Sequence, residues 1–464
     1  MKKRNVQTAN LNIDWKNFYR QVLGLVIPIA IQNLINVGVQ ASDVIMLGRV
    51  GEKVLSGASL AGQVQFIMTL IFFGITSGAT VLTAQYWGKG DRKTIEKILG
   101  MGLTGGILTA IVFFTAAMAM PETLMRIFTS DVEVIAEGVK YLRIVSIAYI
   151  FMAVTQVYLN IVRSIERVVI STVVYSISLL TNITINAVLI FGLLGFPAMG
   201  IEGAAIGTLT ARTVEMLIVI WYAKWRNKDI RVHISYMWKI NPVLLKDYLR
   251  YSLPVIMNEL MWGLGTSANT AIIGHLGSSA VAANSVAQVA RQLAMVIVFG
   301  ISHATAIYLG KTIGSKRYEE AKVYGKKFIA LSLIFGIAGS VVILIAAPIA
   351  NTFLALTPQA KQYLLFMFGV MAYFVIAQAL NSTLVVGIFR SGGDTRFGLF
   401  LDVGTMWGCS ILLGFAAAFF FHAPVPVVYM ILLSDELIKL PITFRRFRSY
   451  KWLKNVTREL PKDN

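Results

Sequence analysis

The sequence has a single cysteine, little charge and none of the short motifs of common enzymes. Only 14% of its 464 residues are charged. Cys409 alone excludes an intramolecular disulfide and a metal site built from several cysteines. The four histidines are scattered along the chain, and no HExxH, GxxxxGK[ST] or GxSxG pattern occurs. We therefore expect a protein that is neither an enzyme nor an ATP-driven pump, and that needs no cofactor.

What the chain does have is apolar sequence. Hydrophobic residues make up 56% of it, and the mean hydropathy is +0.69. Segments of 20 or more mostly apolar residues recur, each long enough to cross roughly 30 Å of hydrocarbon. The first twenty residues are polar and lack the apolar core of a signal peptide, so we expect the first helix to be retained. The composition predicts an all-α integral membrane protein.

Hydropathy predicts twelve transmembrane helices. The expected spans are about 20–47, 55–84, 96–120, 139–162, 168–193, 199–223, 246–273, 279–310, 323–350, 361–389, 397–421 and 424–444. Grouped by sixes, they give an amino-terminal lobe at 20–224 and a carboxy-terminal lobe at 246–444. The intervening segments are an amino-terminal tail at 1–19, a linker at 225–245 and a carboxy-terminal tail at 445–464.

The distribution of basic residues predicts the orientation. Most of the 42 Lys and Arg residues fall in the two tails and the gaps on the same side as the tails. The gaps on the opposite side hold five: Arg49, Lys53, Arg126, Lys140 and Lys361. The positive-inside rule then places both termini in the cytoplasm, with the protein in the cell membrane. The net charge of +19 is explained by topology and contact with anionic lipids, so we expect no nucleic-acid partner.

An internal repeat divides the chain. An offset of 226 residues places Pro28 on Pro254, and it also aligns Phe73-Gly74-Ile75 with Phe299-Gly300-Ile301. Six spans per half is an even number, so both halves enter the membrane from the same side. Two such lobes are related by a pseudo-twofold axis along the membrane normal, and a substrate is expected between them.

The amino-terminal lobe holds a candidate cation site. Asp43 lies six residues before Arg49, roughly 9 Å below the outer surface at 1.5 Å per residue. Asn182 and Asn186 share one helix face, and with Thr208 they lie at similar depth. One carboxylate, two amides and a hydroxyl suit Na⁺ or a proton better than a transition metal. The alternative is a hydrogen-bonded packing network, since Asn and Thr commonly join membrane helices.

Other charges lie within the spans of the carboxy-terminal lobe. Glu259 lies near mid-membrane and could bind a cationic substrate or a second cation. Arg291, at similar estimated depth, could instead neutralise it as a buried ion pair. Arg212 and Glu215 in the amino-terminal lobe are spaced to pair with each other. The remaining acids are expected to be interfacial or paired near the cytoplasmic ends: Asp402, Asp435 with Lys439, and Glu436.

Two prolines occupy matching places in the repeat. Pro28 and Pro254 each free a carbonyl one turn earlier and permit a helix to bend. They are hinge candidates, with a static kink as the alternative.

Several motifs together carry a family resemblance. They are the two proline segments, SDVIMLGRVG at 42–51, QYWGKGD at 85–91, PAMGIEGAAIGT at 197–208 and FRSGGDTRF at 389–397. With these the chain resembles NorM-like members of the multidrug and toxic compound extrusion (MATE) family over nearly its whole length. The resemblance implies two six-helix lobes around a central cavity. It also implies secondary active, alternating-access export of cationic amphipathic drugs in exchange for Na⁺ or H⁺, and we expect a monomer.

The resemblance also implies that the family's amino-terminal cation site lies at Asp43, Asn182, Asn186 and Thr208. Two features depart from the family pattern. Glu259 lies about one turn before the expected acid of the seventh span, and the tenth span has no acid. A rival function within the wider superfamily is a flippase for a lipid-linked precursor, which would need a strongly basic cavity.

Overall fold

The computed structural model describes residues 13–353 and 357–459, and every regular element within these ranges is helical. Nine of the described helices are long and apolar enough to cross a membrane, and the bent pair α5 and α6 adds a tenth. α10 and the broken pair α16 and α17 complete twelve spans in two lobes, as the sequence predicts.

The first lobe runs from α1 to α8. Its elements are α1 (Trp15–Val50), α2 (Glu52–Lys89), α3 (Arg92–Ala119), α4 (Pro121–Arg126), α5 (Val132–Val145), α6 (Ala148–Ser164), α7 (Val169–Phe191), η1 (Leu193–Gly195), α8 (Gly200–Trp221) and η2 (Tyr222–Arg226). A short helix, α9 (Ser235–Trp238), lies in the connection to the second lobe.

The second lobe runs from α10 to α17. Its elements are α10 (Pro242–His275), α11 (Ser278–Gly314), α12 (Tyr318–Phe353), α13 (Pro358–Ser382), η3 (Thr383–Phe389), α14 (Thr395–Thr405), η4 (Met406–Ile411), α15 (Leu412–Phe419), α16 (Val425–Leu432) and α17 (Asp435–Arg448).

One of the motifs that carry the family resemblance is a helix boundary. In QYWGKGD, Gly90 adopts the left-handed conformation (φ 83°) that ends α2, and Asp91 caps α3 by accepting from the Thr94 amide. Glycine adopts positive φ without steric cost, and an aspartate side chain satisfies a free amide at a helix start. The motif therefore produces a sharp turn between two spans.

Two spans are broken where the sequence predicts continuous helices. The fourth begins earlier than expected, at Val132, and bends by 55° between α5 and α6, where the Ser146 hydroxyl bonds the Arg143 carbonyl. The twelfth stops at Leu432 and restarts at Asp435, with the Ser434 hydroxyl bonding the Ile431 carbonyl. Serine hydroxyls compete for helix carbonyls and commonly accompany such bends.

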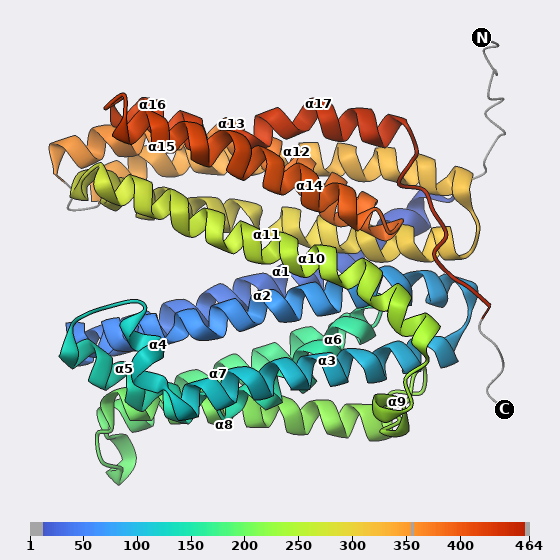
Figure 1. Cartoon of the computed structure of the whole chain (residues 1–464), viewed down its shortest axis with the longest axis horizontal. Helices are drawn as coiled ribbons and strands as arrows, with labels where there is room; N and C mark the ends of the chain where they lie inside the picture. Colours follow the sequence, from blue (N-terminus) through green and yellow to red (C-terminus); the bar gives the residue numbers. More distant parts are fainter. Residues whose placement is uncertain (1–12, 354–356, 460–464) are drawn as a thin grey trace.

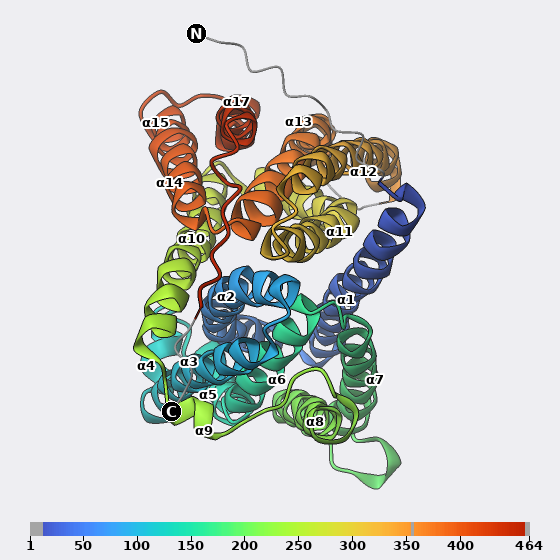
Figure 2. The ribbon, with the colours of Figure 1, turned by 90° about the vertical axis from the view of Figure 1, so that its right-hand side faces the viewer.

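The repeat is visible in how the lobes meet. α1 packs against α11 of the other lobe, and its repeat equivalent α10 packs against α2. Figure 2 shows the two lobes side by side with these four helices between them. In Figure 1 the lobes converge at the end of the bundle where α1 begins and the segment after α17 ends at residue 459, and they diverge toward the other end. We call these the terminal end and the opposite end.

Two repeat-related glycines set the approach of the lobes at the terminal end. A Cβ on Gly88 would lie 2.0 Å from the Lys311 carbonyl oxygen, and one on Gly314 would lie 1.9 Å from the Gln85 carbonyl oxygen. Any side chain at either position would push α2 and α11 apart. The same offset of 226 residues relates Gly88 to Gly314 and Gln85 to Lys311. The contact is therefore made twice, with the roles of the lobes exchanged.

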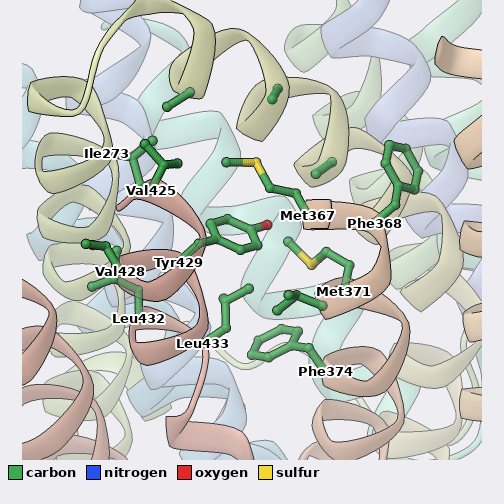
Figure 3. Packing of buried hydrophobic residues seen from close by; sticks show 14 of the residues in the cluster. Ile273, Met367, Phe368, Met371, Phe374, Val425, Val428, Tyr429, Leu432 and Leu433 are labelled. Carbon is green, nitrogen blue, oxygen red and sulfur yellow. The ribbon is translucent and has the colours of Figure 1, made fainter. Parts of the chain in front are cut away.

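Each lobe also has its own apolar core. In Figure 3 the Tyr429 ring of α16 lies beside Met367 and Met371 of α13, with Val428 and Leu432 on the same helix. These side chains are buried. A further apolar cluster crosses between the lobes, where Phe18 and Val22 of α1 pack with Tyr308 and Phe328 of the second lobe.

Candidate functional site

The structure brings Asp43, Asn182 and Asn186 together. The Asn186 amide donates to Asp43 Oδ1 at 2.7 Å and to Asn182 Oδ1 at 3.3 Å. Both asparagines are buried, at 0% and 2% exposed, whereas Asp43 is half-buried. The predicted helix face of α7 is therefore turned toward the carboxylate on α1.

Thr208 lies nearby but is not bonded directly to the carboxylate. It is buried on α8 and lies beside Tyr141 of α5, which in turn lies near Asp43. Thr208 thus borders the cluster through Tyr141. No hydrogen bond given for the described residues joins it to Asp43.

A close helix contact holds Asn186 in place. A Cβ on Gly207 of α8 would lie 1.9 Å from Asn186 Oδ1, so only glycine leaves room for the amide. Gly203, one turn earlier, faces the backbone of Leu189 at a similarly short distance. Small residues spaced by four allow membrane helices to approach closely. The segment GIEGAAIGT therefore positions α8 against α7.

The cluster keeps free oxygen acceptors. Asn186 Oδ1 is buried without a hydrogen-bond partner, and a single amide proton occupies one oxygen of Asp43. Arg212 and Glu215 pair at 2.6 Å, as the spacing predicts, and Arg212 lies within electrostatic reach of Asp43. Those two charges offset each other, which leaves Asp43 as the net negative charge. Oxygen acceptors around one carboxylate can bind a monovalent cation or hold a proton.

The prediction that Arg291 pairs with Glu259 is wrong. Arg390 Nη2 donates to Glu259 Oε1 at 2.9 Å, and its Nη1 donates to Ser77 of α2 at 3.1 Å. Arg291 instead bonds the side chains of Gln288 and Gln378. Counting residues gives a depth but not the direction around the helix axis, and Arg291 faces α13 rather than α10. The Glu259–Arg390 pair, bonded to Ser77, joins the two lobes.

A cavity opens in the second lobe beside this pair. It encloses about 1010 Å³, including its mouth, and Glu259, Asp402 and Glu436 line it together with Arg390 and Lys439. Apolar walls come from Phe73, Trp262, Phe299 and Val385. Mixed apolar and charged walls of this size are typical of small-molecule sites.

The acids of α14 and α17 are paired, which is one of the two predicted alternatives, and Asp435 and Glu436 are also buried. Lys439 Nζ lies 3.2 Å from Asp402, 3.0 Å from Asp435 and 3.3 Å from Glu436, so the predicted pair with Asp435 is confirmed. The cause is the break between α16 and α17. It places Asp435 and Glu436 in the first turn of a helix, where amide dipoles favour negative charge. Asn258 also donates to Asp402.

The two prolines lie inside helices, as predicted. Pro28 is within α1 and Pro254 within α10, and the Thr172 hydroxyl bonds the Pro28 carbonyl. Both helices border the boundary between the lobes. Whether either bends during function stays a prediction.

Two arginines were missed as interior groups because they lie at the predicted helix ends. Arg163 closes α6 and Arg390 follows η3, yet both line a second, smaller cavity between the lobes. The repeat offset, which aligns Arg163-Ser164 with Arg390-Ser391, was the signal that could have marked them.

At the terminal end the lobes are tied together by the carboxy-terminal segment, residues 449–459. Gln85 of α2 donates to the carbonyls of Ser391 and Lys454 and accepts from the Val456 amide. Lys311 of α11 pairs with Glu166 of the first lobe at 2.7 Å. The described chain is therefore closed at this end.

Comparison with known proteins gives one consistent set of matches. The family model MatE matches residues 28–188 and 254–416. A probable multidrug resistance protein NorM from Thermotoga maritima is 23% identical over 451 residues, covering 96% of each chain. The uncharacterized transporter YisQ of Bacillus subtilis is 22% identical, covering 92% of this chain and 93% of its own.

Solved structures share the fold. A multidrug resistance MATE family transporter in an outward-facing conformation superposes with a TM-score of 0.84 at 17% identity, over 94% of this chain and 97% of that one. A MOP superfamily transporter from Pyrococcus furiosus, described as having a binding pocket of reverse polarity, also gives 0.84 at 17% identity, over 93% and 95%. The two matched segments of the family model start 226 residues apart, which is the offset of the internal repeat.

Proposed function

The chain belongs to the MatE family, and from this premise we propose that it is a secondary active multidrug efflux antiporter. It exports cationic amphipathic organic compounds in exchange for Na⁺ or H⁺ by alternating access. The family is one of transporters, so no enzymatic step is part of the proposal. Relatives named as multidrug resistance proteins support drug efflux as the function.

The proposed setting is the cell membrane, with the terminal end in the cytoplasm. The basic residues of the linker and of the carboxy-terminal segment gather at the terminal end, which supports this orientation. In that orientation the described conformation is closed toward the cytoplasm.

The coupling ion binds at Asp43. The single observation that carries this proposal is the 2.7 Å bond between Asn186 and Asp43 beside a buried amide oxygen with no partner. A carboxylate inside a membrane helix is costly and is usually kept for function. The repeat places Asn269 at the matching position of the second lobe, so the two lobes are not equivalent in charge there.

The substrate binds in the cavity of the second lobe. Its lining has three carboxylates against two basic groups, and Asp435 adds a fourth carboxylate beside Lys439. An excess of negative charge among aromatic and aliphatic walls favours an organic cation. It disfavours the pyrophosphate of a lipid-linked precursor, so the antiporter is preferred to the flippase.

Coupling follows from different ion affinities in the two states. An ion shifts the equilibrium only when it binds one state more tightly. Asp43 lies on α1, which contacts both α7 of its own lobe and α11 of the other. A change at Asp43 that bends α1 near Pro28 would therefore alter the contact between lobes, and Pro254 would do the same for α10.

The experiment that tests the function uses proteoliposomes with Na⁺ and pH gradients imposed separately. A fluorescent organic cation should move uphill when one gradient is present and stop when that gradient is collapsed. Transport that only equalises the dye concentration would contradict an antiporter.

A further inference from the structure

A small chamber lies between the lobes, between the substrate cavity and the terminal end. Phe73, His303, Val386 and Arg390 line both spaces, so the chamber adjoins the cavity on the side of the terminal end. It is closed below by Ser391, whose carbonyl is bonded to Gln85. The chamber therefore exists only while the lobes are joined at that end.

The chamber contains positive charge with no acidic residue among its lining side chains. Arg163 of the first lobe and Arg390 of the second both face it. Both guanidinium groups are close enough to His303 to act on it electrostatically. Arg390 is neutralised by Glu259. The chamber thus retains the charge of Arg163.

Arg163 has no carboxylate partner. Its Nη2 bonds the side-chain oxygen of Gln32, a neutral amide, and no ion pair given for the described residues includes it. Its Nε is buried and has no hydrogen-bond partner. Buried charges in proteins are normally paired or bound to an ion, because leaving them alone costs several kcal/mol. A partly buried guanidinium that faces a cavity and has no carboxylate partner points to an anion.

A hydroxyl donor lies beside the arginines. Ser77 accepts from Arg390, so its own hydrogen remains free to donate into the chamber. The hydroxyls of Thr76 and Thr80 instead donate to backbone carbonyls of their own helix. The donors available to an anion are therefore the remaining guanidinium N–H groups of Arg163, since its Nε is closed off from the chamber, and the Ser77 hydroxyl.

The size of the chamber limits the occupant. The chamber encloses about 490 Å³ including its mouth, against about 1010 Å³ for the substrate cavity. Of this, about 30 Å³ is open to the centre of a water molecule. One water needs about 10–15 Å³ on this measure. The space therefore fits a single small ion with little hydration and excludes a drug-sized molecule.

We propose that this chamber binds a halide-sized monovalent anion, held by Arg163 and Ser77 against Arg390. The anion neutralises Arg163 while the two lobes are closed at the terminal end. Both hydrogen-bond donors come from the first lobe, Arg163 on α6 and Ser77 on α2, and the Arg390 guanidinium of the second lobe faces them. The anion therefore lies between positive groups of the two lobes and stabilises the closed state. Binding requires neither the ion at Asp43 nor a substrate, so it stands apart from the proposed transport function.

The test measures equilibrium binding of radiolabelled chloride to the purified full-length protein in a potassium gluconate background. We expect saturable binding that bromide displaces and gluconate does not. Arg163→Gln should weaken it by roughly tenfold or more, because a hydrogen bond to a charged group is lost. Arg163→Lys should retain most of it, and Ser77→Ala should weaken it. Arg291→Gln, which removes an interior arginine outside the chamber, is the matched control and should bind as the unaltered protein does.

Absence of saturable chloride binding to the unaltered protein would overturn the proposal. So would equal binding by the unaltered protein and Arg163→Gln. If Arg163→Gln does not yield a monodisperse protein, Ser77→Ala decides, because it removes one hydroxyl and no charge. Unchanged affinity in that variant would then contradict the proposed site.

Discussion

The side-chain amide of Asn186 lies 2.7 Å from the carboxylate of Asp43, and this bond joins α7 to α1. Asn186 is itself fixed by contact with Gly207 of α8. A change in the charge of Asp43 is therefore transmitted to two neighbouring helices. This arrangement sets the expectations for the first two variants.

Asn186→Ala should change the apparent affinity for the coupling ion. It should weaken Na⁺ binding, which loses an amide oxygen, and strengthen H⁺ binding, because the Asn186 amide stabilises the charged carboxylate. Losing a hydrogen bond to a charged group typically costs about 1.5–3 kcal/mol, or roughly a tenfold effect or more. Asn182→Ala should have a smaller effect, because its bond to Asn186 is 3.3 Å and does not involve Asp43. The measurement is the ion concentration that gives half-maximal dye transport. Equal effects of the two variants would contradict the geometry.

Gly207→Ala should destabilise the first lobe. The added Cβ would lie 1.9 Å from Asn186 Oδ1, and forcing extra atoms into a packed contact costs about 1–3 kcal/mol. Gly62→Ala on α2 is the control, because a Cβ there meets nothing within 4 Å. Thermal unfolding in detergent should show a lower midpoint for Gly207→Ala alone. A midpoint equal to that of Gly62→Ala would argue against close packing.

The Glu259–Arg390 pair should behave as a unit. Removing one partner leaves a buried charge, which typically costs about 3–5 kcal/mol, whereas removing both leaves none. Glu259→Gln and Arg390→Gln should therefore each lower the unfolding midpoint more than the double variant does. Glu259→Gln combined with Arg291→Gln should be additive, since these residues are not bonded. If the Glu259 and Arg291 changes were non-additive and the Glu259 and Arg390 changes were additive, Arg291 would be the partner of Glu259.

Gln85→Leu should loosen the terminal end. The change removes two donated bonds and one accepted bond that tie α2 to the second lobe and to the carboxy-terminal segment. The reporter is Thr80→Cys, which lines the chamber between the lobes, in a protein whose native cysteine is removed by Cys409→Ser. With Gln85→Leu this cysteine should react faster with a membrane-impermeant thiol reagent added at the terminal side. Gln63→Leu, at an exposed position of α2, is the control and should leave the rate unchanged. No acceleration by Gln85→Leu would mean that these bonds do not hold the end closed.

Much of the fold could be predicted because hydropathy, proline positions and the repeat are one-dimensional signals. The cluster of Asp43, Asn182 and Asn186 could also be predicted. The spacing of the two asparagines along α7 puts them on one helix face, and counting residues places that face at the depth of Asp43 on α1. Thr208 was predicted at the correct depth, yet its contact is with Tyr141.

Contacts that depend on direction around a helix axis were not predictable. Glu259 was assigned to Arg291 by depth alone, whereas Arg390 reaches it from a predicted helix end. Asp435 and Glu436 were predicted to be interfacial or paired, without a choice between the two, because a break in the twelfth span leaves no clear hydropathy signal. Their burial beside Lys439 needs the three-dimensional arrangement of α14 and α17.

The central claim is that Asp43 carries the coupling ion, and ion-driven dye transport by Asp43→Asn in proteoliposomes tests it most directly. Asn has nearly the size of Asp but no charge, so the protein should stay folded and lose gradient-driven transport. Glu133→Gln, which neutralises an exposed carboxylate at the start of α5, should transport as the unaltered protein does. Undiminished uphill transport by Asp43→Asn would contradict the account.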